Sequence, residues 1–486
     1  MSLPDTVGGE QAIGKKVVSA MKWQAAAQGI GQAVTWLSTL VVIRLLSPAD
    51  YGLLAMAGVL TGFFLLVADM GVGAASVQAR TLSSDDLQRL GGLAMLTNGV
   101  GFLLCIPAAP LLAAYFGEHR LTEIVLAQSV VFLILALYSI PQAQLMRALD
   151  FKRKSRVDAV AMVVSAVGAV GFALAGFGVW AIVIANLLLH STRAVGYRSA
   201  QSAILPPTLD RGITRFLRFG ALITLDRVLF FLISQADVVI GGRILGSSVL
   251  GVYIVAMSVA VIPLDKVVPI LTQVSFAAYS RIQVDAARVR RSMLLAVRLV
   301  SFAAFPVFFG LAAVAGALVP AVLGHKWLEI VLPLQLISLI LPLKAIVSML
   351  PPALFGTGKP EVNVANQTLS LGLLVIALLV GVRHGIVGLS LAWMVVYPVI
   401  FAISCVRTAR ALGMMPRDLF LECWFPAVAA AAMGAVTFLL GGNLPADWSP
   451  WYVLIIQVVA GAVLYVAAVA AFRMPLAREA LSLLRP

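Results

Sequence analysis

Two apolar runs decide the class of this chain: VNVANQTLSLGLLVIALLVG (362–381) and IVGLSLAWMVVYPVIFAISCV (386–406). Only the residues VRHG (382–385) separate them. An α-helix of about 20 residues is long enough to cross a bilayer, so each run predicts one transmembrane helix. Similar runs recur from end to end of the 486-residue chain, which indicates an all-α polytopic membrane protein.

The composition excludes the soluble classes of protein. The chain is 61% hydrophobic and 12% charged, whereas soluble domains are about half apolar and a quarter charged. A cytosolic enzyme, a secreted domain and a disordered protein are therefore excluded. Cys105, Cys405 and Cys423 lie in or beside apolar runs without CxxC spacing, so we expect neither a metal site nor a disulfide framework. The sequence has no P-loop, and we expect no ATP hydrolysis and no cofactor.

The positions of the charges orient the bundle. We count about fourteen spans, and most Lys and Arg residues fall in alternate gaps between them rather than in one nucleic-acid-binding patch. The positive-inside rule assigns those gaps to the cytoplasm, and an even number of spans then places both termini there. The first apolar run is long enough to span, which favours a retained helix over a cleaved signal peptide.

A weak internal repeat divides the chain. Arg44 with Gly52 follows span one, and Arg243 with Gly251 follows span seven at the same spacing. We therefore predict two parallel six-helix lobes, related by a pseudo-two-fold axis along the membrane normal, plus two C-terminal helices. The predicted segments are a cytoplasmic N-terminal segment (1–22), an N-terminal lobe (23–200), a cytoplasmic linker (201–217), a C-terminal lobe (218–410) and the two extra helices with a cytoplasmic tail (411–486).

Seven motifs, in order along the chain, carry a family resemblance. They are RLLSPADYGLLAM (44–56), ADMGVGAASVQ (68–78), QLMRALDFKRKS (144–155), GFGVWAIV (176–183), QADVVIGGRIL (235–245), YSRIQVDAARVRR (279–291) and LFGTGKPEV (354–362). Together they resemble the Wzx-type, WzxC-like polysaccharide flippases of the multidrug/oligosaccharidyl-lipid/polysaccharide (MOP) exporter superfamily. The resemblance extends from about Trp23 to Cys405.

The resemblance implies a fold and a function. It implies fourteen helices in two six-helix lobes around a central cavity. It also implies that an undecaprenyl-diphosphate-linked oligosaccharide is flipped from the inner to the outer leaflet of the bacterial cytoplasmic membrane by alternating access. Such a step serves exopolysaccharide, capsule or O-antigen assembly, in the company of a polysaccharide polymerase and other assembly proteins.

Two other classes of function stay open. One is a lipid II flippase or an ion-coupled small-molecule antiporter of the same superfamily; the other is a membrane enzyme of polysaccharide assembly, such as a polymerase. A drug–cation antiporter favours acidic, aromatic cavities, whereas here cations within the spans rival the acids. The short gaps leave little room for an enzyme's acid–base site, so we expect no enzymatic activity.

Span one carries a stripe of polar side chains. Gln24, Gln28 and Gln32 recur every four residues, and Thr35 and Thr39 continue the line on one helical face. Amides facing lipid would lack hydrogen-bond partners. We interpret the stripe as a wall of a hydrated substrate cavity; the alternative is polar contact between packed helices.

Span seven carries the most charge. Asp226 and Asp237 share a face because eleven residues of helix return to within about 20°. Arg227 lies at the edge of that face, and Ser234 is a further cavity candidate. We expect Arg227 to pair with the substrate diphosphate while an aspartate takes protons or holds Arg227 between cycles; the alternative is a structural ion pair. Asp237 matches the family motif, and Arg227 is not part of it.

Four further charges complete the candidate site. Lys344 within span ten either faces the cavity, snorkels or loses its proton. Arg44 and Arg243 form a symmetric pair at the outer mouth or are ordinary helix-end cations. Asp69, near the end of span two, joins Asp226 and Asp237 as an ion-coupling candidate, the alternative being an interfacial acid.

Overall fold

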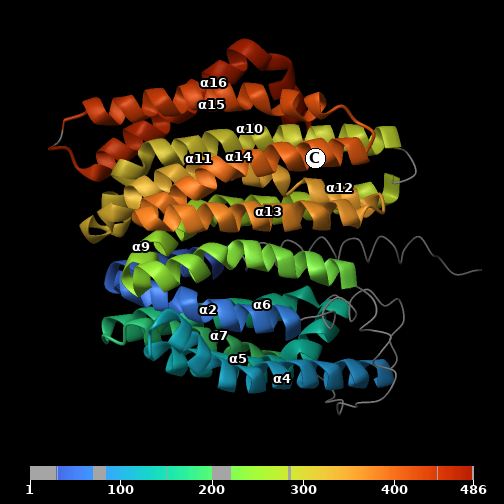
Figure 1. The fold of residues 1–486 in the computed structure, drawn as a ribbon, viewed down its shortest axis with the longest axis vertical. Helices are drawn as coiled ribbons and strands as arrows, with labels where there is room; N and C mark the ends of the chain where they lie inside the picture. Colours follow the sequence, from blue (N-terminus) through green and yellow to red (C-terminus); the bar gives the residue numbers. More distant parts are fainter. Residues whose placement is uncertain are drawn as a thin grey trace, which may run out of the picture. The chain divides into compact units, whose positions relative to one another are not determined.

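The computed structural model describes residues 29, 31–68, 84–148, 150–199, 221–282, 286–445 and 447–483, and every regular element among them is a helix (Figure 1). The chain divides into two compact units, Met1–Thr224 and Leu225–Pro486, which are described separately below. The predicted lobe and tail boundaries stay predictions, and the segments 1–22 and 201–217 lie outside the described residues.

The first unit is built from helical hairpins. Its described helices are Gly31–Leu45, α2 (Pro48–Ala68), α4 (Ser84–Phe116), α5 (Arg120–Arg147), α6 (Phe151–Leu174) and α7 (Val179–Ser199). α4 packs on α5, α6 packs on α7, and α5 and α7 join the two pairs.

One carboxylate ties together two of the motifs that carry the family resemblance. The Asp50 carboxylate accepts hydrogen bonds from the Ser47 amide (2.9 Å) and hydroxyl (2.6 Å), and from the Val179 amide at the start of α7 (2.9 Å). Gly178, with φ +54°, lies so close that a Cβ there would be 3.0 Å from Asp50 Oδ1. Asp50 therefore joins 44–56 to 176–183 and provides an acceptor at the N-terminus of α7.

The second unit contains the remaining described helices. They are α9 (Ala221–Ile282), α10 (Ala286–Leu318), the short π segment η2 (Val319–Leu323), the 3₁₀ segment η3 (His325–Ile330), α11 (Val331–Val347), α12 (Leu350–Gly356), α13 (Pro360–Gly381), the 3₁₀ turn η4 (Val382–His384), α14 (Gly385–Ala411), α15 (Pro416–Asn443) and α16 (Pro450–Leu483). Prolines begin α13, α15 and α16, where a missing N–H costs nothing.

α9 is a folded-back pair of helices rather than one rod. At Gly246 the backbone leaves helical geometry with φ 78° and ψ 173°. The Tyr253 hydroxyl donates to the Asp237 carboxylate at 2.7 Å, although sixteen residues of straight helix would separate them by about 24 Å. Predicted spans seven and eight therefore lie side by side within this element.

The structure confirms the all-helical membrane class. Eleven helical segments of the described part are long and apolar enough to cross a bilayer, and the chain is a multi-pass membrane protein. Two of these segments, Leu225–Leu264 and Pro360–Ala411, each contain a reversal, at Gly246 and at η4. The count of fourteen spans stays a prediction.

The α13–α14 hairpin depends on two glycines. A Cβ placed on Gly388 would overlap the Gly381 carbonyl and lie 2.8 Å from His384 Cβ. A Cβ on Gly381 would meet the Gly388 backbone in return. The two helices leave the four-residue turn with their backbones in contact, which leaves no room for a side chain at either position.

We expect Gly388→Ala to lower the thermal unfolding midpoint of the detergent-purified protein by several degrees, because overpacking costs about 1–3 kcal/mol. Gly372→Ala is the matched control, since nothing lies within 4 Å of a Cβ there in α13. That control should leave the midpoint unchanged or raise it slightly. Equal midpoints for the two variants would contradict the close backbone contact.

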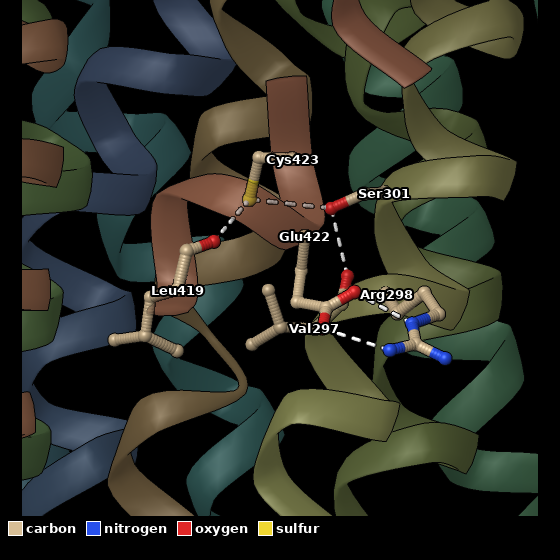
Figure 2. A network of polar contacts seen from close by, with 6 residues as sticks. All are labelled: Val297, Arg298, Ser301, Leu419, Glu422 and Cys423. Atoms are coloured by element: carbon tan, nitrogen blue, oxygen red, sulfur yellow. Dashed lines mark hydrogen bonds and ion pairs between the residues drawn. The ribbon is translucent and has the colours of Figure 1, made fainter. Parts of the chain in front are cut away.

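α15 is fastened along α10 by a small polar network (Figure 2). The Arg298 guanidinium binds both oxygens of Glu422, with Nε–Oε2 at 2.6 Å and Nη2–Oε1 at 2.8 Å. One turn along, the buried Ser301 hydroxyl donates to the Val297 carbonyl (2.7 Å) and lies 3.5 Å from Cys423 Sγ. α16 also contacts α10, so the last two helices are integral to this unit.

We expect Arg298→Ala and Glu422→Ala each to destabilise the protein by about 1–2 kcal/mol. A bidentate, partly buried ion pair contributes more to the free energy of unfolding than an exposed pair does. The double variant should lose less than the sum of the two. Arg120→Ala is the control, since Arg120 lies on the surface, 3.7 Å from Glu118. Thermal unfolding of the wild type and the four variants measures these losses, and strict additivity of the two single losses would show that the pair contributes nothing.

Candidate functional site

A cavity with a mostly apolar lining and a few polar side chains lies among the helices of the second unit. Its volume is about 360 Å³, and it is lined from α9, α11, α12, α13 and α14. Its apolar lining includes Phe230 and Ile233 of α9 and Ile400 of α14. Polar groups reach the cavity from α9, α11, α13 and α14, and they are the part of the lining that a substrate could recognise.

α13 supplies the largest group of polar side chains. Asn363, Asn366, Gln367 and Ser370 all line the cavity. Their spacing of i, i+3, i+4 and i+7 places them on one face of the helix. Exposed apolar side chains, such as Ile376 at 64%, occupy other positions of α13. α13 thus directs its asparagine and glutamine amides inward, as a helix in lipid must.

Asp226 of α9 faces this stripe. The Asn363 amide donates to Asp226 Oδ1 at 2.6 Å, and Gln367 contributes a second hydrogen bond to the same carboxylate. The carboxylate therefore has two amide partners from α13 and still lines the cavity. A carboxylate has about four acceptor positions, so Asp226 retains capacity to accept from a bound molecule.

Lys344 of α11 lies at the cavity wall on the face of an aromatic ring. Its Nζ is 5.2 Å from the centre of the Trp393 ring, within the range of a cation–π contact. Lys344 also interacts electrostatically with Asp237. The Asp237 side chain is 3% exposed and accepts from the Tyr253 hydroxyl and, at 2.8 Å, from the Val238 amide. Asp237 is thus buried next to the cavity wall, where Lys344 is a nearby cation.

Several residues predicted from the sequence meet at this cavity. Asp226, Ser234 and Lys344 line it, and Asp237 lies just behind it. Arg227 and Arg243 are exposed on α9 and are not among the lining residues. Their predicted contacts with substrate stay predictions.

The remaining predicted residues belong to the first unit. On the helix Gly31–Leu45, the Thr35 hydroxyl donates to the Gly31 carbonyl and the Thr39 hydroxyl to the Thr35 carbonyl, both at 2.8 Å. These hydroxyls are therefore satisfied within their own helix. Gln32 is half-buried on the same helix, and Arg44 is exposed near its end. Gln24, Gln28 and Asp69 lie outside the described residues.

Comparison with known proteins decides the family. The family described as "Polysaccharide biosynthesis protein" matches residues 41–332. The chain belongs to this family. It is 28% identical to the lipopolysaccharide biosynthesis protein WzxC of Escherichia coli (strain K12) over 444 residues, covering 88% of each chain. It is 26% identical to the teichuronic acid biosynthesis protein TuaB of Bacillus subtilis (strain 168) over 438 residues, covering 88% of this chain and 89% of that relative.

A solved structure shares the fold. The lipid II flippase MurJ, in its inward closed conformation, superposes with a TM-score of 0.74 over 93% of this chain and 99% of its own. At 14% identity, this likeness shows the fold alone. This member of the polysaccharide biosynthesis family therefore shares the helical fold of MurJ.

Sequence reasoning missed the stripe on α13. The same rule that singled out Gln24, Gln28 and Gln32 in span one applies to Asn363, Asn366 and their neighbours. It also missed an ion cluster in the first unit, where Asp158 of α6 contacts three residues. They are Lys154 at 2.8 Å, Arg193 at 3.0 Å and the Tyr197 hydroxyl at 2.9 Å. This cluster joins α6 to α7.

We expect Lys344→Gln to destabilise the protein, because it leaves the buried Asp237 charge without its cation. Adding Asp237→Asn should recover much of the loss, since no net charge then stays buried. Thermal unfolding midpoints of the purified single and double variants measure this coupling. A double variant no more stable than Lys344→Gln would show that Lys344 does not compensate Asp237.

Proposed function

We propose that this protein flips an undecaprenyl-diphosphate-linked oligosaccharide from the inner to the outer leaflet of the bacterial cytoplasmic membrane by alternating access. The observation that carries the proposal is a cavity among the apolar helices of the second unit into which charged, amide and hydroxyl side chains reach. Membership in the polysaccharide biosynthesis family and the names of WzxC and TuaB indicate that the cargo belongs to polysaccharide assembly.

The physical problem of such a step is the polar part of the substrate. The polyprenyl tail can stay in lipid, but sugar hydroxyls need hydrogen-bond partners and each phosphate charge needs compensation. A bare charge at the centre of a bilayer costs at least about 3 kcal/mol. The cavity offers amides and hydroxyls to the sugar hydroxyls, and Arg227 on α9 offers the cation that we assign to the diphosphate.

In this function the chain is a transporter and not an enzyme, with both termini in the cytoplasm. Its partners are the lipid-linked glycan, the bilayer, and a polysaccharide polymerase or other assembly proteins that take the glycan at the outer face. Asp226 and Asp237 are the described carboxylates that could couple the cycle to protons or another ion, since both lie at or behind the cavity wall.

We expect deletion of the gene to accumulate a complete, unpolymerised repeat unit on its carrier lipid, confined to the inner leaflet. Mass spectrometry of extracted lipids measures the amount. Protection from periodate in intact spheroplasts reports the leaflet. Complementation with wild type should clear the intermediate, and Arg227→Ala should clear it at least tenfold more slowly at equal expression. Arg383→Ala is the control, because Arg383 is an exposed arginine of η4 away from the cavity.

Other outcomes point to other functions. Complete units that reach the outer face and stay unpolymerised would overturn flipping and favour a polymerase. An unchanged pool of carrier intermediates would favour ion-coupled export of a small molecule. Full clearance of the intermediate by the Arg227→Ala variant would show that Arg227 does not bind the diphosphate during flipping. The flippase proposal itself would stand.

A further inference from the structure

Two residues that line the cavity have a buried polar atom without a hydrogen-bond partner, Asn366 at Oδ1 and Trp393 at Nε1. The Asn366 side chain is 6% exposed and lines the cavity, yet its Oδ1 accepts no hydrogen bond. Buried amide oxygens are nearly always paired, and an unpaired one costs about 1–3 kcal/mol. A hydrogen-bond donor of a bound molecule would supply the partner that Asn366 Oδ1 lacks.

The charges of the lining oppose a diphosphate here. Among the lining residues, Asp226 is the one acid and Lys344 the one base. Lys344 is already engaged by the Trp393 ring and by the Asp237 charge. A diphosphate in the cavity would meet the Asp226 carboxylate, and Arg227, whose charge acts on Asp226, is not among the lining residues. A neutral group rich in hydroxyls matches the amides, hydroxyls and balanced charge better.

The size and the aromatic lining of the cavity suit a sugar ring. The cavity of about 360 Å³ is at the lower end of the range of small-molecule sites, about 300–1,000 Å³. It therefore takes one end of a glycan rather than a whole repeat unit. Trp393 and Tyr397, with ring centres 5.8 Å apart, provide an aromatic wall beside the amides of α13. A pyranose ring has C–H faces that can pack on the aromatic wall and a rim of hydroxyls that can bond to the amides.

We propose that this cavity is a glycan subsite that reads one sugar unit of the cargo. A sugar O–H or acetamido N–H donates to Asn366 Oδ1, and Ser370 and the remaining acceptor positions of Asp226 take neighbouring hydroxyls. The diphosphate is bound elsewhere. This inference rests on the proposed function and adds to it the part of the substrate that the second unit selects.

The test compares two lipids bound to the full-length purified protein in nanodiscs, by native mass spectrometry. One probe is the lipid-linked oligosaccharide extracted from cells that lack this gene, and the other is bare undecaprenyl diphosphate. We expect Asn366→Leu to weaken binding of the glycan-linked probe about tenfold and to leave binding of the bare carrier unchanged. Ser370→Ala should show the same selectivity with a smaller loss, and it keeps the test open if Asn366→Leu folds poorly.

Two controls separate local from general effects. Thr368→Val removes an exposed hydroxyl of the same helix that bonds to the Val364 carbonyl, outside the lining. Ser338→Ala removes a buried hydroxyl of α11 that also lacks a partner and does not line the cavity. Both should bind the two probes as wild type does, and a selective loss in either would overturn the assignment to the cavity.

The remaining outcomes distinguish the two proposals. Equal weakening of both probes by Asn366→Leu would overturn the subsite, because the cavity would then contact the carrier diphosphate. Unchanged binding of both probes to the two cavity variants would also overturn it while leaving flipping intact. A wild-type protein that fails to clear the glycan from the inner leaflet in cells would overturn the proposed function itself.

Discussion

Inside a bilayer, a polar group must find its partner within the protein, because lipid offers none. This constraint accounts for the arrangement of the described helices. Asp237 is buried with Tyr253, Lys344 and the Val238 amide around it. Asp158 is likewise surrounded by Lys154, Arg193 and Tyr197. Each cluster draws its members from different helical segments, so compensating one charge also fixes the packing of the helices that supply its partners.

The two units meet this constraint in different ways. In the first, the ion cluster on α6 and α7 is compact and ties two helices together. In the second, the compensated charge of Asp237 lies behind a wall, and the polar groups in front of it leave an open volume. The same physical requirement thus produces structural ties in both units, including the Arg298–Glu422 pair of the second, and in the second unit it also leaves a cavity with polar side chains in its wall.

The class of fold was predictable from the sequence because it depends on local properties, namely the length and apolar character of each run. Part of the site was also predictable: Asp226, Ser234 and Lys344 are unusual residues within apolar spans, and all three line the cavity. The stripe on α13 could have been predicted too, because its polar residues recur with the period of a helix, as those of span one do. The Asp237–Tyr253 bond could not be predicted, because it depends on where α9 turns back at Gly246.

The polar face of α13 has a consequence for biogenesis. Released alone into lipid, α13 would expose two asparagines, a glutamine and a serine to hydrocarbon before their partners had arrived. α14 follows after a very short turn, and Gly381 and Gly388 let the two backbones meet without side chains between them. We therefore expect α13 and α14 to leave the translocon together, as a preassembled hairpin whose amides are sheltered before either helix reaches the bilayer alone.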